Sequence, residues 1–392
     1  MNVLLAVLFV DILGFGVIIP LLPFMALEFG ASAQQVTWLI ASFPLMQLGF
    51  APLWGRVSDR WGRKPVLILT FAGSVAALLI LAFANALWML FAARLIAGLT
   101  AGNIPAAQAY VADVTPRQRR AQSMGLVGAT FIIGFIVGTG LGAVVSGDPA
   151  EPVFRLPSLI AAGMSTIALL MTFLFLEEPR AAPAATPGPE VEEGELEAQF
   201  RVLALPNIGH LIAVNFLMGY AFANLEAVFA LWANANLDWG PRQVGASFVF
   251  AGLVAAFFQV AILGRLVRSI REIALLGWGV VLLATGMMLL PYSEGLPLLL
   301  VSLTLIAAGI GIGSPTFLSL LSQYSRGDHT GAALGLGQST LSLARVVGPL
   351  CAGFLFAELG HAWPFFTSAF GLVPALFVLV LLQRRIAALD RR

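Results

Sequence analysis

The chain has 392 residues, of which 59% are hydrophobic and only 10% are charged, and its mean hydropathy is +0.93. A soluble domain carries about 25% charged residues, so this composition excludes a soluble protein and indicates a polytopic membrane protein. The net charge is +1 and the basic residues lie in short loops, so no nucleic-acid partner is expected. The single cysteine, Cys351, excludes an internal disulfide and a cysteine zinc site.

Twelve apolar segments are long enough to cross a bilayer, which takes about 20 residues per helix. In chain order, we predict spans at 2–26, 34–54, 65–84, 86–111, 120–146, 157–176, 207–233, 242–263, 272–291, 296–321, 331–357 and 362–383. The first segment lacks a basic leader region and a small-residue cleavage site, so we expect it to be retained as a helix. The predicted fold class is therefore an all-α membrane protein with twelve transmembrane helices.

Residues 177–206 separate the sixth span from the seventh and are rich in Pro, Ala and Glu, which is typical of a linker. We therefore predict a six-helix half over 1–176, a cytoplasmic linker over 177–206, and a second six-helix half over 207–392 that ends in a short basic tail.

The two halves repeat. A shift of 210 residues superposes Pro105 on Pro315, Thr130 on Thr340 and Gly138 on Gly348 without a gap. This internal similarity predicts two pseudo-symmetric halves, an arrangement that in transporters places the substrate site near the middle of the membrane.

The basic residues predict the orientation of the chain. If both termini and the even-numbered loops are cytoplasmic, all but four of the 21 Lys and Arg residues lie on that side. The exceptions are Arg94 and Arg345, inside spans, and Arg155 and Arg242, on the opposite side. Because cytoplasmic loops are enriched in Lys and Arg, we expect both termini in the cytoplasm.

Residues 55–64, between the second and third spans, read GRVSDRWGRK. Their basic side chains cannot enter hydrocarbon, so we predict a tight aqueous loop. The spacing G-x-x-x-D-R-x-G-R-[KR] resembles the signature of the major facilitator superfamily. The first span reads DILGFGVIIPLLP from Asp11, which is similar to the opening of the tetracycline-exporter group. Over nearly its whole length the chain resembles the twelve-span drug:proton antiporter branch of that superfamily.

The resemblance implies roles for several residues. It pairs Arg63 with Asp113, directs Asp59 toward the start of the eleventh span, and makes these residues, together with Gly55, a cytoplasmic gate. It also implies a glycine motif in the fifth span, formed by Gly125, Gly134, Gly138 and Gly142. These glycines favour close helix packing, and the resemblance adds a hinge that prevents proton leak. The family's Gly-Pro is Gly138-Thr139 here, and its Gly-Gly is Gly142-Ala143.

Ionisable groups inside spans cost roughly 2.5–3.5 kcal/mol at a helix centre, so each is a functional hypothesis. Asp11 is the first candidate proton carrier, and the alternative is a fixed ion pair with Arg94. Glu226 is the second candidate. The alternatives are that it is an ion-pair partner for Arg345 or a water-exposed group near the outer opening. Arg94 resembles the family arginine implicated in proton transfer and shares a helical face with Gly98, Gly102 and Pro105. We expect it to influence a nearby carboxylate, and the alternative is a structural hydrogen-bonding role.

The substrate cavity is predicted to be apolar with sparse polar groups, which suits lipophilic or amphipathic molecules better than sugars. Arg345, in line with Gln338, is expected to connect helices as well as to border this cavity. The full predicted lining is Met46, Gln47, Asn103, Tyr110, Asn215, Phe222, Asn224, Gln259, Gln338 and Arg345.

We therefore expect a proton-coupled exporter of lipophilic small molecules, driven by the proton gradient without a cofactor or metal. It would work as a monomer in the bilayer of a bacterial inner membrane. Two alternatives remain open: a symporter or facilitator for a metabolite, and a membrane enzyme or lipid-handling scaffold. No phosphate-binding loop, nucleophile elbow or metal-ligand cluster favours an enzyme.

Overall fold

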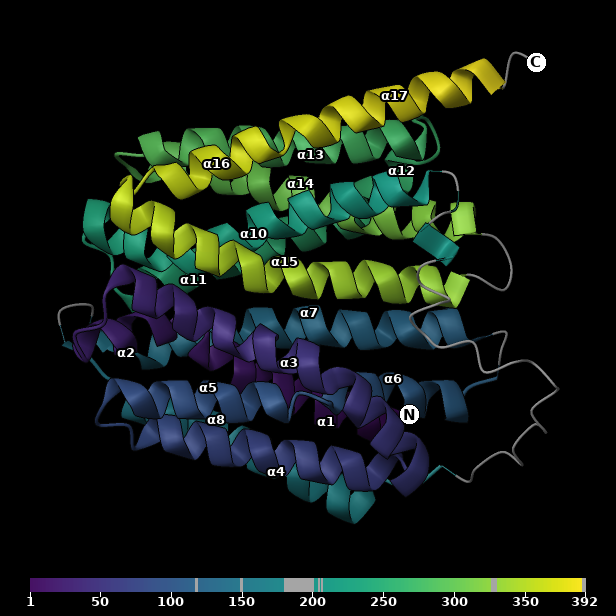
Figure 1. Ribbon diagram of the computed structural model, residues 1–392. Helices are drawn as coiled ribbons and strands as arrows, with labels where there is room; N and C mark the ends of the chain where they lie inside the picture. The colour runs from purple at the N-terminus through teal and green to yellow at the C-terminus, as the bar shows by residue number, and fades with distance from the viewer. Residues whose placement is uncertain are drawn as a thin grey trace. The chain divides into compact units, whose positions relative to one another are not determined.

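A computed structural model describes residues 1–116, 119–148, 151–179, 201–203, 205, 207–325 and 330–389. Within these residues, twelve helical segments are long and apolar enough to cross a membrane, which confirms the predicted all-α polytopic fold (Figure 1). The only strands in the described part of the chain are β1 (Gly147–Asp148) and β2 (Glu151–Pro152), which form a short antiparallel pair.

The first six spans follow one another from the N-terminus. They consist of α1 (Asn2–Ile18) with α2 (Leu22–Glu28), α3 (Ala33–Trp61), α4 (Arg63–Ala82), α5 (Leu87–Leu99) with α6 (Asn103–Val114), α7 (Arg120–Val145) and α8 (Arg155–Phe175).

The second six spans contain two short changes of helix type. They consist of α10 (Ile208–Leu237), α11 (Pro241–Phe257) with the π-helix η2 (Phe258–Ile262) and α12 (Leu263–Leu266), α13 (Glu272–Leu289) with η3 (Leu290–Tyr292), α14 (Leu296–Ser325), α15 (Thr330–Glu358), and α16 (Trp363–Gly371) with α17 (Val373–Leu389).

Contacts divide the chain into two compact units. The first comprises Met1–Gly188 and Ala233–Val249, and the second comprises Pro189–Trp232 and Phe250–Arg392. This division assigns 233–249 to the first unit, whereas the sequence prediction placed these residues in the second half. Most of the predicted linker lies outside the described residues, so the boundaries at 176 and 207 stay a prediction.

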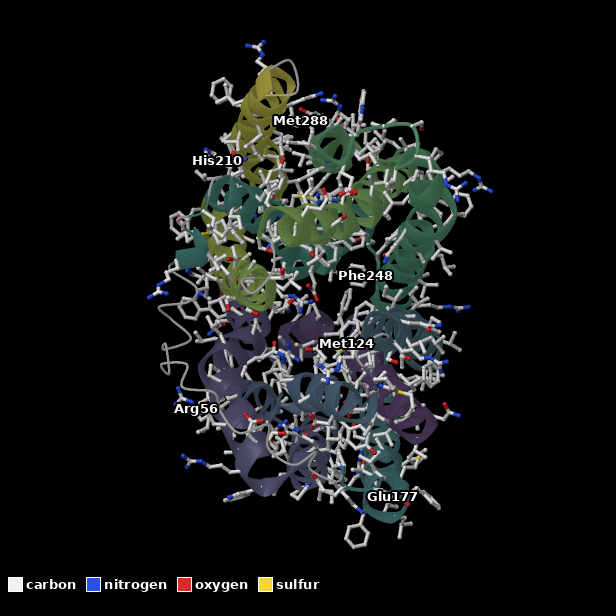
Figure 2. All side chains as sticks on the ribbon, turned by 90° about the vertical axis from the view of Figure 1, so that its right-hand side faces the viewer. Arg56, Met124, Glu177, His210, Phe248 and Met288 are labelled. Atoms are coloured by element: carbon white, nitrogen blue, oxygen red, sulfur yellow. The ribbon has the colours of Figure 1, made fainter. Side chains whose placement is uncertain are left out.

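The predicted aqueous loop at 55–64 is wrong in extent. Helix α3 continues to Trp61, and α4 begins at Arg63, so Gly62 alone separates the two helices. Gly62 has φ 98°, a backbone conformation that favours glycine. The charged motif is therefore mostly helical, and its exposed Arg56 side chain points away from the ribbon (Figure 2).

The fourth span was predicted as one helix, but the structure interrupts it. Helix α5 ends at Leu99 and α6 begins at Asn103. Pro105 contributes to the break because proline lacks a backbone N–H and its ring collides with the carbonyl four residues earlier. The continuous face predicted from Arg94 to Pro105 therefore does not exist.

The first unit has a hydrophobic core built mainly from α1, α4 and α6, with Leu4, Leu8, Phe71 and Val111 among its buried side chains. In the second unit, α13 and α14 pack closely because Gly279 and Gly309 leave no room for side chains between them. These two packing arrangements fix the helices that carry the candidate site residues.

Candidate functional site

Asp11 lies on α1 and is buried, with 5% of its surface exposed. Its Oδ2 accepts a hydrogen bond from Nδ2 of Asn103 (2.7 Å), and its Oδ1 accepts one from the hydroxyl of Ser165 (3.0 Å). The donors come from α6 and α8, so one carboxylate joins three helices. Both donors are neutral side chains, and they satisfy the charged form of a group that apolar surroundings would otherwise disfavour.

Asn103 was predicted to line the substrate cavity, and the structure places it directly on Asp11. Ser165, which is 1% exposed, was not predicted. A single serine in an apolar span carries no sequence signal, because serine also bonds to its own helix backbone. Its role becomes visible only when the packing of α1 against α8 is known.

Arg94 is buried on α5, and its guanidinium carbon lies 4.6 Å from the centre of the Phe43 ring. This is a cation–π contact across the α3–α5 interface. Gly98 makes that interface close, because a side chain there would meet Phe43 and Met46. Met46, predicted in the cavity, therefore takes part in packing. The predicted influence of Arg94 on a carboxylate stays a prediction.

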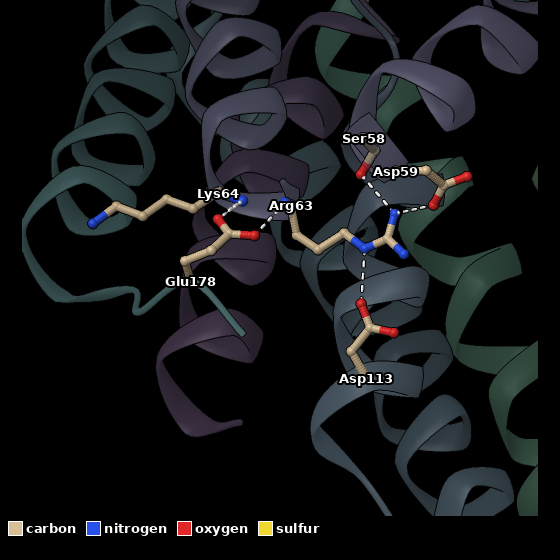
Figure 3. A network of polar contacts seen from close by, with 6 residues as sticks. All are labelled: Ser58, Asp59, Arg63, Lys64, Asp113 and Glu178. Carbon is tan, nitrogen blue, oxygen red and sulfur yellow. Dashed lines mark hydrogen bonds and ion pairs between the residues drawn. The ribbon is translucent and has the colours of Figure 1, made fainter. Parts of the chain in front are cut away.

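Arg63 is the centre of a polar network at the start of α4, shown in Figure 3. Its Nε donates to Oδ2 of Asp113 (2.8 Å), and its Nη1 donates to Oδ1 of Asp59 (2.5 Å) and to Oγ of Ser58 (3.1 Å). The predicted ion pair between Arg63 and Asp113 is confirmed. Its function as a gate stays a prediction.

Glu178 completes this network and was not predicted. Its two carboxylate oxygens accept from the backbone N–H groups of Arg63 (2.6 Å) and Lys64 (2.8 Å), as Figure 3 shows. A carboxylate at a helix N-terminus satisfies unpaired N–H groups and interacts favourably with the helix dipole. We call Ser58, Asp59, Arg63, Lys64, Asp113 and Glu178 the Arg63 network. The Glu-Glu-Pro sequence that follows the sixth span was its only sequence signal.

The predicted glycine motif divides into two parts. Gly134, Gly138 and Gly142 of α7 lie against the backbone of α1, where an added Cβ would meet carbonyl oxygens of that helix. Their close-packing role is confirmed. Gly125 has open space beside it and does not belong to this surface, and Gly55 has no close neighbour among the described residues either. Only the middle and the end of α7 approach α1 closely, and a residue without a side chain is required only there.

Thr139 stands where the resemblance expects proline, and it is fully buried. Its hydroxyl lies 3.4 Å from the carbonyl oxygen of Gly16 on α1, a long hydrogen bond. The threonine therefore keeps the regular helix and adds a polar contact to the α1–α7 interface.

In the second unit, Glu226 on α10 and Arg345 on α15 form an ion pair with 3.9 Å between Oε2 and Nη2. The alternative in which Glu226 is a partner for Arg345 is therefore present in the structure. On the same helices, Nδ2 of Asn215 donates to the carbonyl oxygen of Gly337 (2.9 Å). Asn215 and Glu226 both link α10 to α15, so this face of α10 is a helix interface.

Two residues of the predicted cavity lining are packed in the interior of their units. The Tyr110 ring belongs to the core of the first unit, and its hydroxyl donates to the carbonyl oxygen of Glu177 (3.0 Å). Asn224 is fully buried and donates to Ser368 on α16 (2.9 Å). The polar group of Tyr110 bonds to the segment after α8 and that of Asn224 bonds to α16, and the place of both residues in the cavity lining stays a prediction.

The remaining residues of that set stay predictions. Gln259, Gln338 and Phe222 are exposed, and Gln47 is partly exposed. Gln259 lies in η2, where the wider π-helical turn changes the direction of the following side chains. Such short π-helices are frequent at functional sites.

The comparisons with known proteins agree with this architecture. The sequence model of the Major Facilitator Superfamily matches residues 4–213 and again residues 211–390. The chain is 31% identical to the class G tetracycline resistance protein of Vibrio anguillarum over 96% of this chain and 95% of that one. It is 27% identical to multidrug resistance protein 1 of Bacillus subtilis, over 93% and 92% of the two chains. Among solved structures, the human organic anion transporter MFSD10 (TETRAN) superposes with a TM-score of 0.71 at 26% identity, covering 96% of this chain and 98% of that one.

Proposed function

Because this chain belongs to the Major Facilitator Superfamily, a family of membrane transporters, we propose that it exports lipophilic or amphipathic small molecules in exchange for protons. The single observation that best supports proton coupling is the buried carboxylate of Asp11. An ionisable group in the interior of a span is retained for a reason, and proton relays are a common one. The two side chains that donate hydrogen bonds to it, Asn103 and Ser165, are neutral.

Two observations support the proposed substrate class: the similar proteins, and the residues of the predicted cavity lining that are exposed in the structure. The similar proteins include tetracycline and multidrug resistance proteins. Tetracycline-like and other lipophilic cyclic compounds are therefore the first substrates to test. The exposed residues of the predicted lining, Phe222 and Gln259, offer an aromatic surface and an amide, which suit such compounds.

In the proposed cycle, the proton gradient is the energy source and no cofactor takes part. Protons from outside neutralise Asp11, with or without Glu226, and substrate entering from the cytoplasm competes with those protons. Alternating access then exposes the site to each side in turn. The chain would act as a monomer in a bacterial inner membrane, with both termini in the cytoplasm.

The experiment measures proton release from acidified inverted membrane vesicles after addition of a compound panel. Wild type is compared with Asp11→Asn and Glu226→Gln, and Glu358→Gln serves as a carboxylate control at the end of α15. Compound-dependent proton release that is lost in Asp11→Asn and kept in Glu358→Gln is the expected result. Release that requires sodium, substrate movement in the direction of uptake, or no response with correctly inserted protein would each contradict the proposal.

A further inference from the structure

Helix α6 has a polar contact at each end, and the two contacts join different parts of the first unit. At its first residue, Asn103 donates to Asp11 on α1. Ten residues later, Asp113 accepts from Arg63 at the start of α4. A rise of 1.5 Å per residue places these ends about 15 Å apart. One short helix thus connects the buried carboxylate with the Arg63 network, and Figure 3 shows the Asp113 end of this connection.

The break in the fourth span separates this helix from α5. The chain between them, residues 100–102, is not helical, and the indole N–H of Trp54 donates to the carbonyl oxygen of Leu99 (2.6 Å). Gly102 lies against the Trp54 ring, where no side chain fits. The backbone N–H groups of Ala101 and Gly102 donate to the carbonyl oxygens of Gly98 and Thr100. Because this departs from the regular i→i−4 pattern of an α-helix, α6 can shift without carrying α5 with it.

The orientation of the Asn103 amide is fixed by its own helix. Its Oδ1 accepts from the backbone N–H of Ile104 (2.9 Å), so the group that faces Asp11 must be the NH₂. An NH₂ group donates but does not accept. The hydroxyl of Ser165 can do both, because it rotates. The two partners of Asp11 therefore respond differently when the carboxylate gains a proton.

We propose that α6 transmits the protonation of Asp11 to the Arg63–Asp113 ion pair, and that Asn103 is the positioning residue through which it does so. This proposal rests on the proposed function, in which Asp11 carries the proton. A proton from the medium bonds to Oδ1, where Ser165 can turn and accept from it. The charge-assisted bond from Asn103 to Oδ2 then becomes a weaker neutral one. The N-terminal end of α6 is released, and Asp113 at its other end shifts relative to Arg63.

Several charged and titratable groups lie on the elements packed around Asp11. On α6 they are Tyr110 and Asp113, on α7 Arg120, and on α8 Arg155. Arg155 and Asp113 are each ten residues, or about 15 Å of helix, from Ser165 and Asn103. Arg94, on α5, contacts the Phe43 ring. Asp11 is the titratable group that bonds directly to Asn103 and Ser165.

Trp54 supplies a readout at the break itself. The test records tryptophan fluorescence of the purified full-length protein in lipid nanodiscs between pH 4.5 and 9, and takes the difference between wild type and Trp54→Phe. We expect a pH-dependent Trp54 signal in wild type that is lost in Asp11→Asn and in Asn103→Leu. Ser165→Ala is the matched control, because it removes the other donor without touching α6. It should keep the signal, with its pH midpoint displaced by less than about one unit.

Asp113→Asn tests the opposite end of the helix. Since coupling is reciprocal, weakening the pair with Arg63 should raise the pH midpoint of the Trp54 signal in the wild-type background. A pH-independent Trp54 signal, or equal behaviour of Asn103→Leu and Ser165→Ala, would overturn the proposal. Asn103→Ala replaces the leucine variant if that variant does not fold. The measurement needs no substrate, so failure of export would show separately, as absent proton release in vesicles with an intact Trp54 signal.

Discussion

The guanidinium of Arg63 bonds simultaneously to Asp113 on α6 and to Asp59 on α3, while the backbone N–H of the same residue is capped by Glu178. One residue therefore ties the ends of α3, α4 and α6 to the segment that follows α8. The geometry depends on the forked shape of arginine, whose Nε and Nη1 address different acceptors at the same time.

Arg63→Lys is predicted to fail nearly as completely as Arg63→Ala in the proton-release assay. A lysine ammonium keeps the charge but cannot reach both carboxylates in the same arrangement. We expect at least a tenfold loss of transport in both variants at equal protein levels. Arg56→Lys, at an exposed position in the same motif, is the control and should retain activity. Full activity of Arg63→Lys would show that charge alone is sufficient.

Glu178→Ala is predicted to lower stability by about 1 kcal/mol, because two backbone N–H groups at the start of α4 lose their acceptor. The measurement is the apparent Tm of the purified protein in detergent. Glu177→Ala is the matched control, since the contact with α4 uses only the Glu178 side chain. Equal Tm values for the two variants would contradict the capping role.

Gly138→Ala is predicted to destabilise the first unit by about 1–3 kcal/mol, because the added methyl group meets the carbonyl oxygen of Leu13 and α1 must move. Gly125→Ala provides a control on the same helix, at a position with open space. It should be neutral or slightly stabilising, because alanine favours helix over glycine. Thermal unfolding of both variants checks the difference, and a similar loss in each would argue against specific α1–α7 packing.

The fold could be predicted from sequence because it depends on properties that each segment carries alone. A run of apolar residues such as 272–291 can satisfy its backbone in lipid only as a helix, so twelve such runs specify twelve spans. The repeat of Pro105 at Pro315 and of Gly138 at Gly348 then indicated two related halves. The ends of the helices were harder to predict from sequence, because a helix can continue into the charged residues beyond the apolar run, as α3 does to Trp61.

Candidate site residues could be predicted only where the side chain is energetically unfavourable inside its own apolar span. Asp11, Arg94 and Glu226 are conspicuous because charge is rare inside spans. Ser165 and Tyr110 are ordinary in an apolar helix, and their functions depend on which group a neighbouring segment places opposite them. Uncharged polar residues therefore could not be divided into cavity and packing positions without tertiary contacts.

Tyr110→Phe is predicted to lower stability by about 1 kcal/mol and to leave the substrate profile unchanged. The hydroxyl bonds to the carbonyl oxygen of Glu177, and its loss leaves that acceptor with one partner fewer. Apparent Tm and the relative responses to the compound panel are measured on the same preparations. A changed order of preferred compounds at unchanged Tm would instead show that the Tyr110 hydroxyl affects substrate recognition.

Glu226 and Arg345 are predicted to contribute less than about 1 kcal/mol to stability as a pair, because the Arg345 side chain is 42% exposed and the charges are 3.9 Å apart. A double-mutant cycle with Glu226→Gln, Arg345→Gln and the double variant measures that coupling by apparent Tm. Wild type and these three variants, assayed for proton release, separate a structural role from a transport role. If Glu226 carries a proton, Glu226→Gln lowers release in both backgrounds, with or without Arg345. If the carboxylate serves only to neutralise the arginine, the double variant recovers the activity that each single variant loses.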